Sequence, residues 1–496
     1  MIRQDAALPQ PLLVLMAVGV AAVVGALAVL SVQAALTAVL VVTLVAAYLH
    51  SPRLGLLLLW ALWLLVPGVR RLLALLGPVP GNDPLSVLPF VATGALGVLE
   101  AQRCRLDGRA RYLVAMAVAG LAFGVPLGLR SPQALVFAGL AYFAAVSAFF
   151  IGWAEVERSR GSFSLRTALL AGAPVIAAYG VYQYFDTPLW DEMWIASVDF
   201  ESLGAPEEGK IRIFSSLNSP GALAGVMSLA MIFALGSRRL GVGHALAIVP
   251  ITAALALTYV RGTWIALLVA LLAFAALGRA RSAPRVASLL VFFTVLVLAA
   301  GYAGPTGAAF KERVSTAGEL GDDISATERL FRFQEIPSAA RSAPAGRGLG
   351  QAGEASELTD RPGGPSDIQK YPDNGILALI FQSGPAGALL VMGALLWGLS
   401  IAVRRALGRS AEAIDLVIAT AIAFLVVAML FGDTLFGITG AILWYLLGIA
   451  LARAQAEEPA EPPQRTARRA PAARVRSSPT PRRVPVEAGA SFARRA

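Results

Sequence analysis

The stretch PLLVLMAVGVAAVVGALAVLSVQAALTAVLVVTLVAAYL, residues 11–49, contains no charged side chain. A helix needs about 20 apolar residues to cross the roughly 30 Å hydrocarbon core of a bilayer. This stretch is long enough for two crossings, and no small-residue cleavage site followed by a soluble domain comes after it. We therefore interpret it as two retained membrane helices rather than as a cleaved signal peptide.

The rest of the chain repeats this pattern. Of its 496 residues, 57% are hydrophobic and 15% are charged, and the mean hydropathy is +0.69. The apolar residues form long uncharged runs, which predict an all-α fold, a polytopic membrane helical bundle of about 14 spans within a range of 12 to 14. The predicted spans are 11–30, 33–50, 54–67, 85–100, 112–129, 132–152, 164–184, 219–236, 243–260, 262–278, 286–303, 374–400, 413–431 and 435–453.

Arginine residues in the short junctions between spans predict the orientation of the chain. Basic junctions follow every second span and alternate with junctions that contain few arginines. Because basic loops stay on the cytoplasmic side, we expect a protein of the cytoplasmic (inner) membrane whose N- and C-termini are both cytoplasmic. The pair Arg70–Arg71 is the exception, since this orientation places it outside.

Three regions follow from this topology. Residues 1–160 form N-terminal transmembrane helices, and residues 161–453 form a transmembrane core. The core includes two hydrophilic outer loops, 185–218 and 304–372, of which the larger precedes the last three spans. Residues 454–496 are rich in Pro, Ala and Arg, which predicts a disordered basic cytoplasmic tail that contacts anionic lipid rather than nucleic acid.

Polar clusters at four helix ends fall on the predicted outer side of the membrane. They are YGVYQYF (179–185), IRIFSSLNSPG (211–221), LTYVRGTW (257–264) and PDNG (372–375). A charged side chain is costly within the hydrocarbon core, but at a helix end it can extend to the interface. The convergence of four such clusters on one face of the membrane predicts a functional site there.

Each cluster has a structural interpretation beside the functional one. Arg261 either anchors a helix at the interface or presents its planar guanidinium to phosphate oxygens. Asn218 either caps a helix or, together with Arg212, helps to bind an anion at that helix start. Asp373 either complements a helix dipole or acts as a general base or as a charge that orients an acceptor hydroxyl, and Asn374 can cap the same helix.

The segment SATERLFRFQEI, residues 325–336, predicts a helix on the outer membrane surface. Ser325 and Glu328 have the spacing of a capping box, and apolar residues recur every three positions after it. Arg329 and Arg332 are three residues apart and therefore share one face of this helix. The two arginines are either solvated or clamp the pyrophosphate of a lipid.

Taken together, these segments resemble the O-antigen ligase and O-antigen polymerase family of integral-membrane glycosyltransferases. The matching pieces are the four clusters above, in order, and GRGLG (346–350) in the large outer loop. The resemblance covers roughly residues 160–455. It implies transfer of a glycan from a polyprenyl-pyrophosphate donor to a sugar or lipid acceptor at the outer face of the cytoplasmic membrane, with no metal and no other cofactor.

The resemblance also implies roles for individual residues. In the family, arginines hold the pyrophosphate. By this resemblance, the expected catalytic residues are Arg212, Arg261 and Asp373. The expected substrate-binding residues are Asn218, Gln183, Asn374, Arg329 and Arg332.

One feature departs from the family. Ligase members have a histidine as the presumed base beside the asparagine of the large loop, whereas this chain has Asp373 there. An aspartate, with a reference pKa of about 3.9, is a weak base unless burial raises its pKa. We therefore favour polymerisation or transfer of an exopolysaccharide over ligation to lipopolysaccharide.

Two other classes of protein remain open. A transporter or flippase for lipid-linked glycans would have broken helices and ionisable residues at mid-span. Pro174, Gly180 and Pro385 do interrupt predicted spans, whereas the charges gather at one face. A scaffold would instead depend on the 454–496 tail for its function.

Overall fold

The computed structural model describes residues 32–75, 84–158, 163–197, 203–204, 209–236, 242–278, 334–359 and 372–456, together with positions 286–287, 291 and 294. Every regular element within these residues is helical, and none of them forms a strand, so the predicted all-α fold is confirmed. The helices are α2 (Val32–His50), α3 (Pro52–Ala74), α4 (Pro84–Ala101), α5 (Gly108–Ala122), α6 (Val125–Gly128), α7 (Pro132–Arg158), α8 (Ser164–Phe185), α9 (Leu189–Ser197), α10 (Pro220–Leu235), α11 (Val242–Leu257), α12 (Arg261–Leu277), α17 (Gly375–Leu407), α18 (Ala413–Ala428) and α19 (Gly437–Gln455). A further helix covers 334–342, and the 3-10 helix η2 covers Glu354–Leu358.

The described residues include eight helical segments that are long and apolar enough to cross a membrane and four shorter apolar helices. The eight are α2, α3, α4, the α5–α6 pair, α7, α8, α17 and α19, and the shorter four are α10, α11, α12 and α18. Each of these twelve corresponds to a predicted span. The two other predicted spans, 11–30 and 286–303, lie entirely or almost entirely outside the described residues, so the count of fourteen stays a prediction.

Local sequence explains where several helices begin. The side-chain oxygens of Ser51, Asp107 and Ser219 accept hydrogen bonds from backbone N–H groups in the first turns of α3, α5 and α10. Pro52 and Pro220 follow two of these caps, at positions where the missing N–H has no intrahelical partner. Caps of this kind satisfy donors that would otherwise be left without partners at the helix ends.

Glycine lets α7 and α19 approach each other closely. A Cβ atom on Gly152 would lie 2.0 Å from the carbonyl oxygen of Tyr445, and one on Gly448 would lie 2.0 Å from that of Phe149. Membrane helices lack a strong hydrophobic force for association and therefore pack through small residues. The sequence of α19 thus specifies a central helix that is buried along most of its length.

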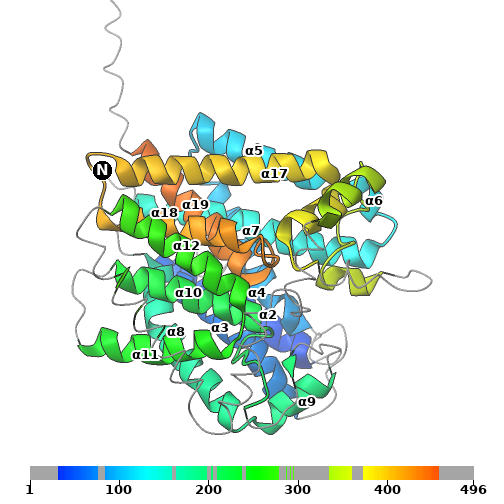
Figure 1. Ribbon diagram of the computed structural model, residues 1–496. Coiled ribbons are helices and arrows are strands. Elements are labelled where there is room, and N and C mark those ends of the chain that lie inside the picture. Colours follow the sequence, from blue (N-terminus) through cyan, green and yellow to red (C-terminus); the bar gives the residue numbers. More distant parts are fainter. Residues whose placement is uncertain are drawn as a thin grey trace, which may run out of the picture. The chain divides into compact units, whose positions relative to one another are not determined.

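Helix α17 lies beside α5, as Figure 1 shows. A Cβ atom on Gly120 would lie 2.6 Å from the carbonyl oxygen of Gly387, and the reverse pair is equally tight at 2.5 Å. Helix α17 breaks at Gly384, whose φ of 71° is left-handed, immediately before Pro385. This break corresponds to the interruption that Pro385 predicts.

Helix α12 has the surface of a helix that faces lipid. Its buried side contains small residues such as Ala266 and Ala270, whereas its exposed side contains Ile265, Leu268 and Leu272. A helix on the surface of a water-soluble protein would expose polar residues instead. This distribution supports a membrane environment for the bundle.

Helix α3 differs from its prediction. The predicted span 54–67 ends at Pro67, but the helix continues through Arg71 to Ala74. It therefore has 23 residues, and the pair Arg70–Arg71 lies in its last turns rather than in a loop. The physical reason is tertiary, because Arg71 is buried and forms an ion pair with Asp191 of α9.

Candidate functional site

Polar side chains gather where α3, α8 and α11 end and where α10, α12 and α17 begin. We call this part of the bundle the site end. Of the eight predicted site residues, six lie in described segments and all six are at the site end. Arg329 and Arg332 lie outside the described residues, as does most of the predicted surface helix 325–336, so their roles stay predictions.

Arg212 is placed next to the turn that carries Arg261. Its Nε donates a hydrogen bond to the carbonyl oxygen of Thr258 at 3.1 Å. The neighbouring amide of Ile213 donates to the carbonyl oxygen of Leu257 at 3.4 Å. Because α12 begins at Arg261, three residues after Thr258, the loop and the helix start bring the two predicted arginines to one place.

The turn between α18 and α19, residues 429–436, joins the starts of two other helices. At the start of α12, a Cβ atom on Gly262 would lie 2.4 Å from Cβ of Phe431. At the start of α17, Nδ2 of Asn374 donates to the carbonyl oxygen of Leu430 at 3.3 Å. Both helix starts therefore pack on a single turn, and each of them carries a predicted catalytic position.

Asp373 and Asn374 have different roles in the fold. Asn374 is the N-cap of α17, and its Oδ1 accepts from the amides of Ile376 and Leu377 at 2.9 and 3.1 Å. It is buried, whereas Asp373 is exposed and has a left-handed φ of 43°. The capping role that the sequence allowed for Asn374 is confirmed, and Asp373 is not the cap.

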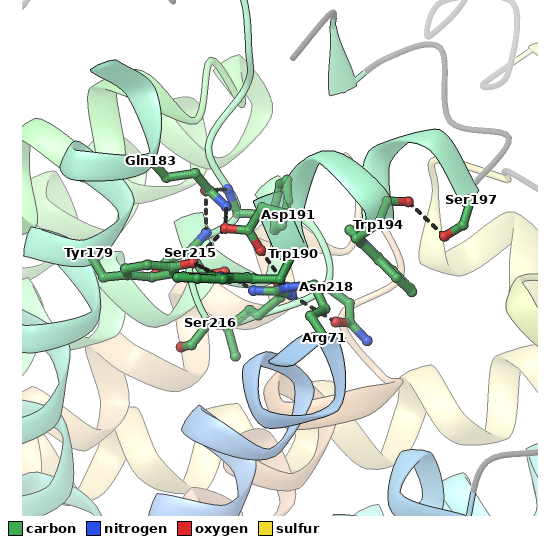
Figure 2. Close-up of polar contacts among 12 residues, drawn as sticks. Arg71, Tyr179, Gln183, Trp190, Asp191, Trp194, Ser197, Ser215, Ser216 and Asn218 are labelled. Atoms are coloured by element: carbon green, nitrogen blue, oxygen red, sulfur yellow. Dashed lines mark hydrogen bonds and ion pairs between the residues drawn. The ribbon is translucent and has the colours of Figure 1, made fainter. Parts of the chain in front are cut away.

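Gln183 lies inside the protein rather than on its surface. Its Nε2 donates to Oδ2 of Asp191 at 2.6 Å, and its Oε1 accepts from the amides of Phe214 and Ser215 at 3.0 and 2.9 Å. Figure 2 shows Gln183 and Asp191 pointing toward each other. Both ends of the amide thus bind protein groups, and Gln183 connects α8 to α9 and to the loop before α10.

Asn218 does not cap α10, because Ser219 does so. Its Oδ1 instead accepts a hydrogen bond from Arg71 at 3.1 Å. Arg71 and Asp191 form an ion pair at 2.7 Å in which both side chains are buried. In the sequence, the signal for Arg71 was the pair Arg70–Arg71, which departs from the charge pattern of the loops. Nothing in the sequence identified Asp191 as the partner of Arg71.

Asp433, in the turn between α18 and α19, is a further candidate that the sequence alone does not single out. Burial raises its pKa to about 6, while hydrogen bonds from the amides of Leu435 and Phe436 partly oppose this shift. Its side chain is nevertheless partly exposed. The sequence signal for Asp433 is an acidic residue in the short junction FGDTLFG between two apolar spans.

Glu354 of η2 is electrostatically coupled to Asp433. Desolvation by the surrounding chain raises the pKa of the Glu354 carboxyl, although the residue as a whole is exposed. The carboxylates of Glu357 and Asp433 raise this pKa further, and Arg70 opposes them. The segment around η2, which belongs to the large loop, therefore reaches the same turn as the helix starts.

The GRGLG sequence in the large loop docks against helices. Gly346, Gly348 and Gly350 all have left-handed φ values, of 76°, 117° and 89°. A Cβ atom on any of them would lie within 2.5 Å of a backbone atom, in α17, α6 and α7 respectively. In addition, the amide of Leu349 donates to the carbonyl oxygen of Gly124 at 2.8 Å. Glycine is required here for close packing, which fixes the loop against the bundle.

Comparison with known proteins gives one family. Residues 246–392 match the family described as O-Antigen ligase. The matched segment is less than a third of the chain and includes Arg261, Asp373 and Asn374, but neither Arg212 nor Gln183. No match was found among curated proteins. The match confirms the resemblance to the O-antigen ligase family.

The match and the apolar helices support the same broad conclusion. They indicate a multi-pass membrane protein with a segment similar to the O-antigen ligase family, and they support a role in polysaccharide biosynthesis. In the described part of the matched segment, polar residues gather at the site end at the start of α12 and at the start of α17. The family to which the segment is similar acts on lipid-linked glycans, and this similarity is the basis for a specific proposal.

Proposed function

We propose that the protein is a glycosyltransferase that transfers or polymerises a glycan from a polyprenyl-pyrophosphate donor. The acceptor is a sugar hydroxyl of another glycan or of a lipid, and the reaction takes place at the outer face of the cytoplasmic membrane. The observation that carries this proposal is the hydrogen bond of 3.1 Å from Arg212 to Thr258, in the turn that leads into Arg261. Two guanidinium groups near one helix start suit a diphosphate.

The proposed reaction is a substitution at the anomeric carbon of the donor sugar. The bond between that carbon and the diphosphate oxygen breaks, and its electron pair leaves with the polyprenyl pyrophosphate. The oxygen of the acceptor hydroxyl forms the new glycosidic bond, and its proton passes to a carboxylate. Arg212 and Arg261 stabilise the negative charge that develops on the leaving diphosphate, an effect that is often the largest in catalysis.

Two carboxylates divide the work on the acceptor in this proposal. Asp433 is the proton acceptor, because its pKa of about 6 is closer to neutrality than that of an ordinary aspartate. Asp373, exposed before α17, orients the acceptor hydroxyl. The proximity of Asp373 and Asp433 is supported by a contact between residues next to them in the chain. A Cβ atom on Gly375 would lie 3.3 Å from the carbonyl oxygen of Gly432.

The test is a transfer assay with purified protein in lipid nanodiscs and a polyprenyl-pyrophosphate glycan. We expect longer or newly linked glycan together with released polyprenyl pyrophosphate. Arg261→Ala should abolish product, whereas Arg130→Ala, a change of an exposed arginine that is not among the predicted site residues, should not. Movement of the donor between leaflets without a new glycosidic bond would support the transporter or flippase instead.

The proposed orientation has its own test. In a Cys104→Ser background, single cysteines at the exposed positions Arg130 and Gln102 should react with a membrane-impermeant maleimide from opposite sides. We expect labelling of position 130 in intact cells and of position 102 only after the membrane is opened. The reverse pattern would place the site end in the cytoplasm and contradict an extracytoplasmic reaction.

A further inference from the structure

Arg71 of α3 has an unusually complete set of partners for a buried arginine. It is 3% exposed, and its Nε donates to Oδ1 of Asp191 at 2.7 Å. One terminal nitrogen donates to the carbonyl oxygen of Leu217 at 2.8 Å and to Oδ1 of Asn218 at 3.1 Å. The other terminal nitrogen donates to the carbonyl oxygen of Ser215 (Figure 2).

The loop that Arg71 binds is the one between Arg212 and α10. Its backbone is unusual at Ser215, which has a left-handed φ of 54°. The guanidinium also lies over the ring of Phe214, with Cζ 4.8 Å from the ring centroid. Since an isolated non-glycine residue in this conformation is strained, surrounding contacts must hold it. Arg71 supplies several of those contacts.

The loop is held from a second direction by the same network. Gln183 accepts hydrogen bonds from two loop amides and donates to Asp191. The hydroxyl of Tyr179 donates to Oδ2 of Asp191 at 2.5 Å. Asp191 therefore links Arg71, which binds the loop carbonyls, to Gln183, which binds the loop amides. Its negative charge also compensates the positive charge of the buried Arg71.

The contact with Asn218 fixes the orientation of its amide. A guanidinium has only donors, so the atom of Asn218 that faces Arg71 is the oxygen. Consequently the NH2 group, which has two hydrogens to donate, lies on the other side of the amide. Since Ser219 caps α10, Asn218 is not needed for capping and its NH2 group stands at the start of a helix.

We propose that Arg71 is a positioning residue of the transfer site: it sets the backbone of residues 214–218 so that Asn218, in the same loop as Arg212, offers its NH2 group to the diphosphate of the lipid-linked donor. This inference rests on the proposed function. Its physical basis is that one planar guanidinium binds two loop carbonyls, one side-chain amide and one carboxylate in a fixed geometry.

Two substitutions separate positioning from binding. Arg71→Lys keeps the charge beside Asp191, but an ammonium group lacks the planar fork that reaches both loop carbonyls and Asn218. Asn218→Asp keeps an oxygen for Arg71 and replaces the NH2 group by a second oxygen, which would repel a diphosphate. Arg453→Lys is the matched control, because Arg453 forms a similar ion pair with Asp415 at 2.6 Å on helices α18 and α19.

The experiment measures donor binding, transfer and hydrogen–deuterium exchange of the loop in nanodiscs. Arg71→Lys should weaken binding of polyprenyl pyrophosphate by about 10- to 100-fold, since losing a hydrogen bond from Asn218 to a charged diphosphate costs about that much, and should speed exchange over 213–218. Asn218→Asp should weaken binding to a similar extent without faster exchange. Arg453→Lys should change neither quantity.

The outcomes distinguish this inference from the proposed function. Wild-type protein that binds polyprenyl pyrophosphate without transferring glycan would refute the proposed function and leave the positioning role intact. Wild-type exchange and affinity in Arg71→Lys would overturn the positioning role, as would a loosened loop with unchanged affinity. Failure of the wild type to bind polyprenyl pyrophosphate would overturn both.

Discussion

Arg212 and Thr258 are joined by a hydrogen bond of 3.1 Å from Nε of the guanidinium to a backbone carbonyl oxygen. This contact connects the loop before α10 to the turn between α11 and α12. It also fixes the Arg212 side chain at the helix start that carries Arg261. Two arginines from separate parts of the sequence thereby become neighbours in one site, and this arrangement leads to the first prediction.

Loss of either arginine should reduce transfer far more than it reduces stability. Arg212→Ala and Arg261→Ala should each lower turnover by about 100- to 1,000-fold, because each removes a fixed charge that stabilises the leaving diphosphate. The melting temperature of the detergent-solubilised protein should change little. Near wild-type turnover in either variant, with Arg130→Ala assayed in parallel, would remove that arginine from the site.

Substitution of Asn374 should change the stability of the protein, whereas substitution of Asp373 should change its activity. Asn374→Ala removes the cap of α17, which typically costs about 1 kcal/mol, and should lower the melting temperature. Asp373→Asn leaves the cap intact and should instead raise the KM for the acceptor about 10-fold, because its role is to orient a hydroxyl. An unchanged acceptor KM in Asp373→Asn would contradict that role.

Turnover should depend on the protonation of Asp433. A base must be deprotonated to accept a proton, so activity should fall as the pH drops through about 6, the pKa of this carboxyl. Asp433→Asn should lose most activity and also the pH dependence in this range. A wild-type profile that stays flat from pH 5 to pH 8 would exclude Asp433 as the base.

The Asp433 carboxyl should affect stability with the opposite dependence on pH: its contribution to stability should be greatest at low pH, where activity is lowest. Its folded-state pKa of about 6 is above the ordinary value of 3.8, so the folded protein binds the proton more tightly than the unfolded chain does. The resulting stabilisation is complete below pH 4 and is lost as the pH rises through 6. Asp433→Asn should therefore raise the melting temperature at pH 8 and have little effect at pH 4.

Glycines of the large loop should differ in their tolerance of alanine. Gly348→Ala would place a Cβ atom 2.5 Å from the amide nitrogen of Gly128 and should destabilise the protein by several kcal/mol, roughly 3 or more. Gly353→Ala is the control, because its φ of 71° is also left-handed but nothing lies within 4 Å. With a ψ of −161° this backbone suits glycine, so the change should cost about 1–3 kcal/mol from backbone strain alone, without the added clash expected at Gly348. Equal melting temperatures would show that close packing of GRGLG is unimportant.

The sequence by itself determined the class of fold and most of its helices. An uncharged run that crosses a bilayer can satisfy its backbone groups within itself only as a helix. Twelve of the predicted spans accordingly correspond to apolar helices in the described residues. Local signals determined some helix starts as well. The cap at Asn374, for example, depends on side-chain and backbone atoms that are adjacent in the chain.

Only the tertiary structure decided which polar residues meet. Arg71 was expected in an outer junction, yet it lies within α3 and pairs with Asp191, 120 residues away. Asp433 acquires its raised pKa from burial by distant parts of the chain, which no local pattern reports. The physical reason is that hydrophobicity and capping act over a few residues, whereas the desolvation and pairing of a charge depend on every element packed around it.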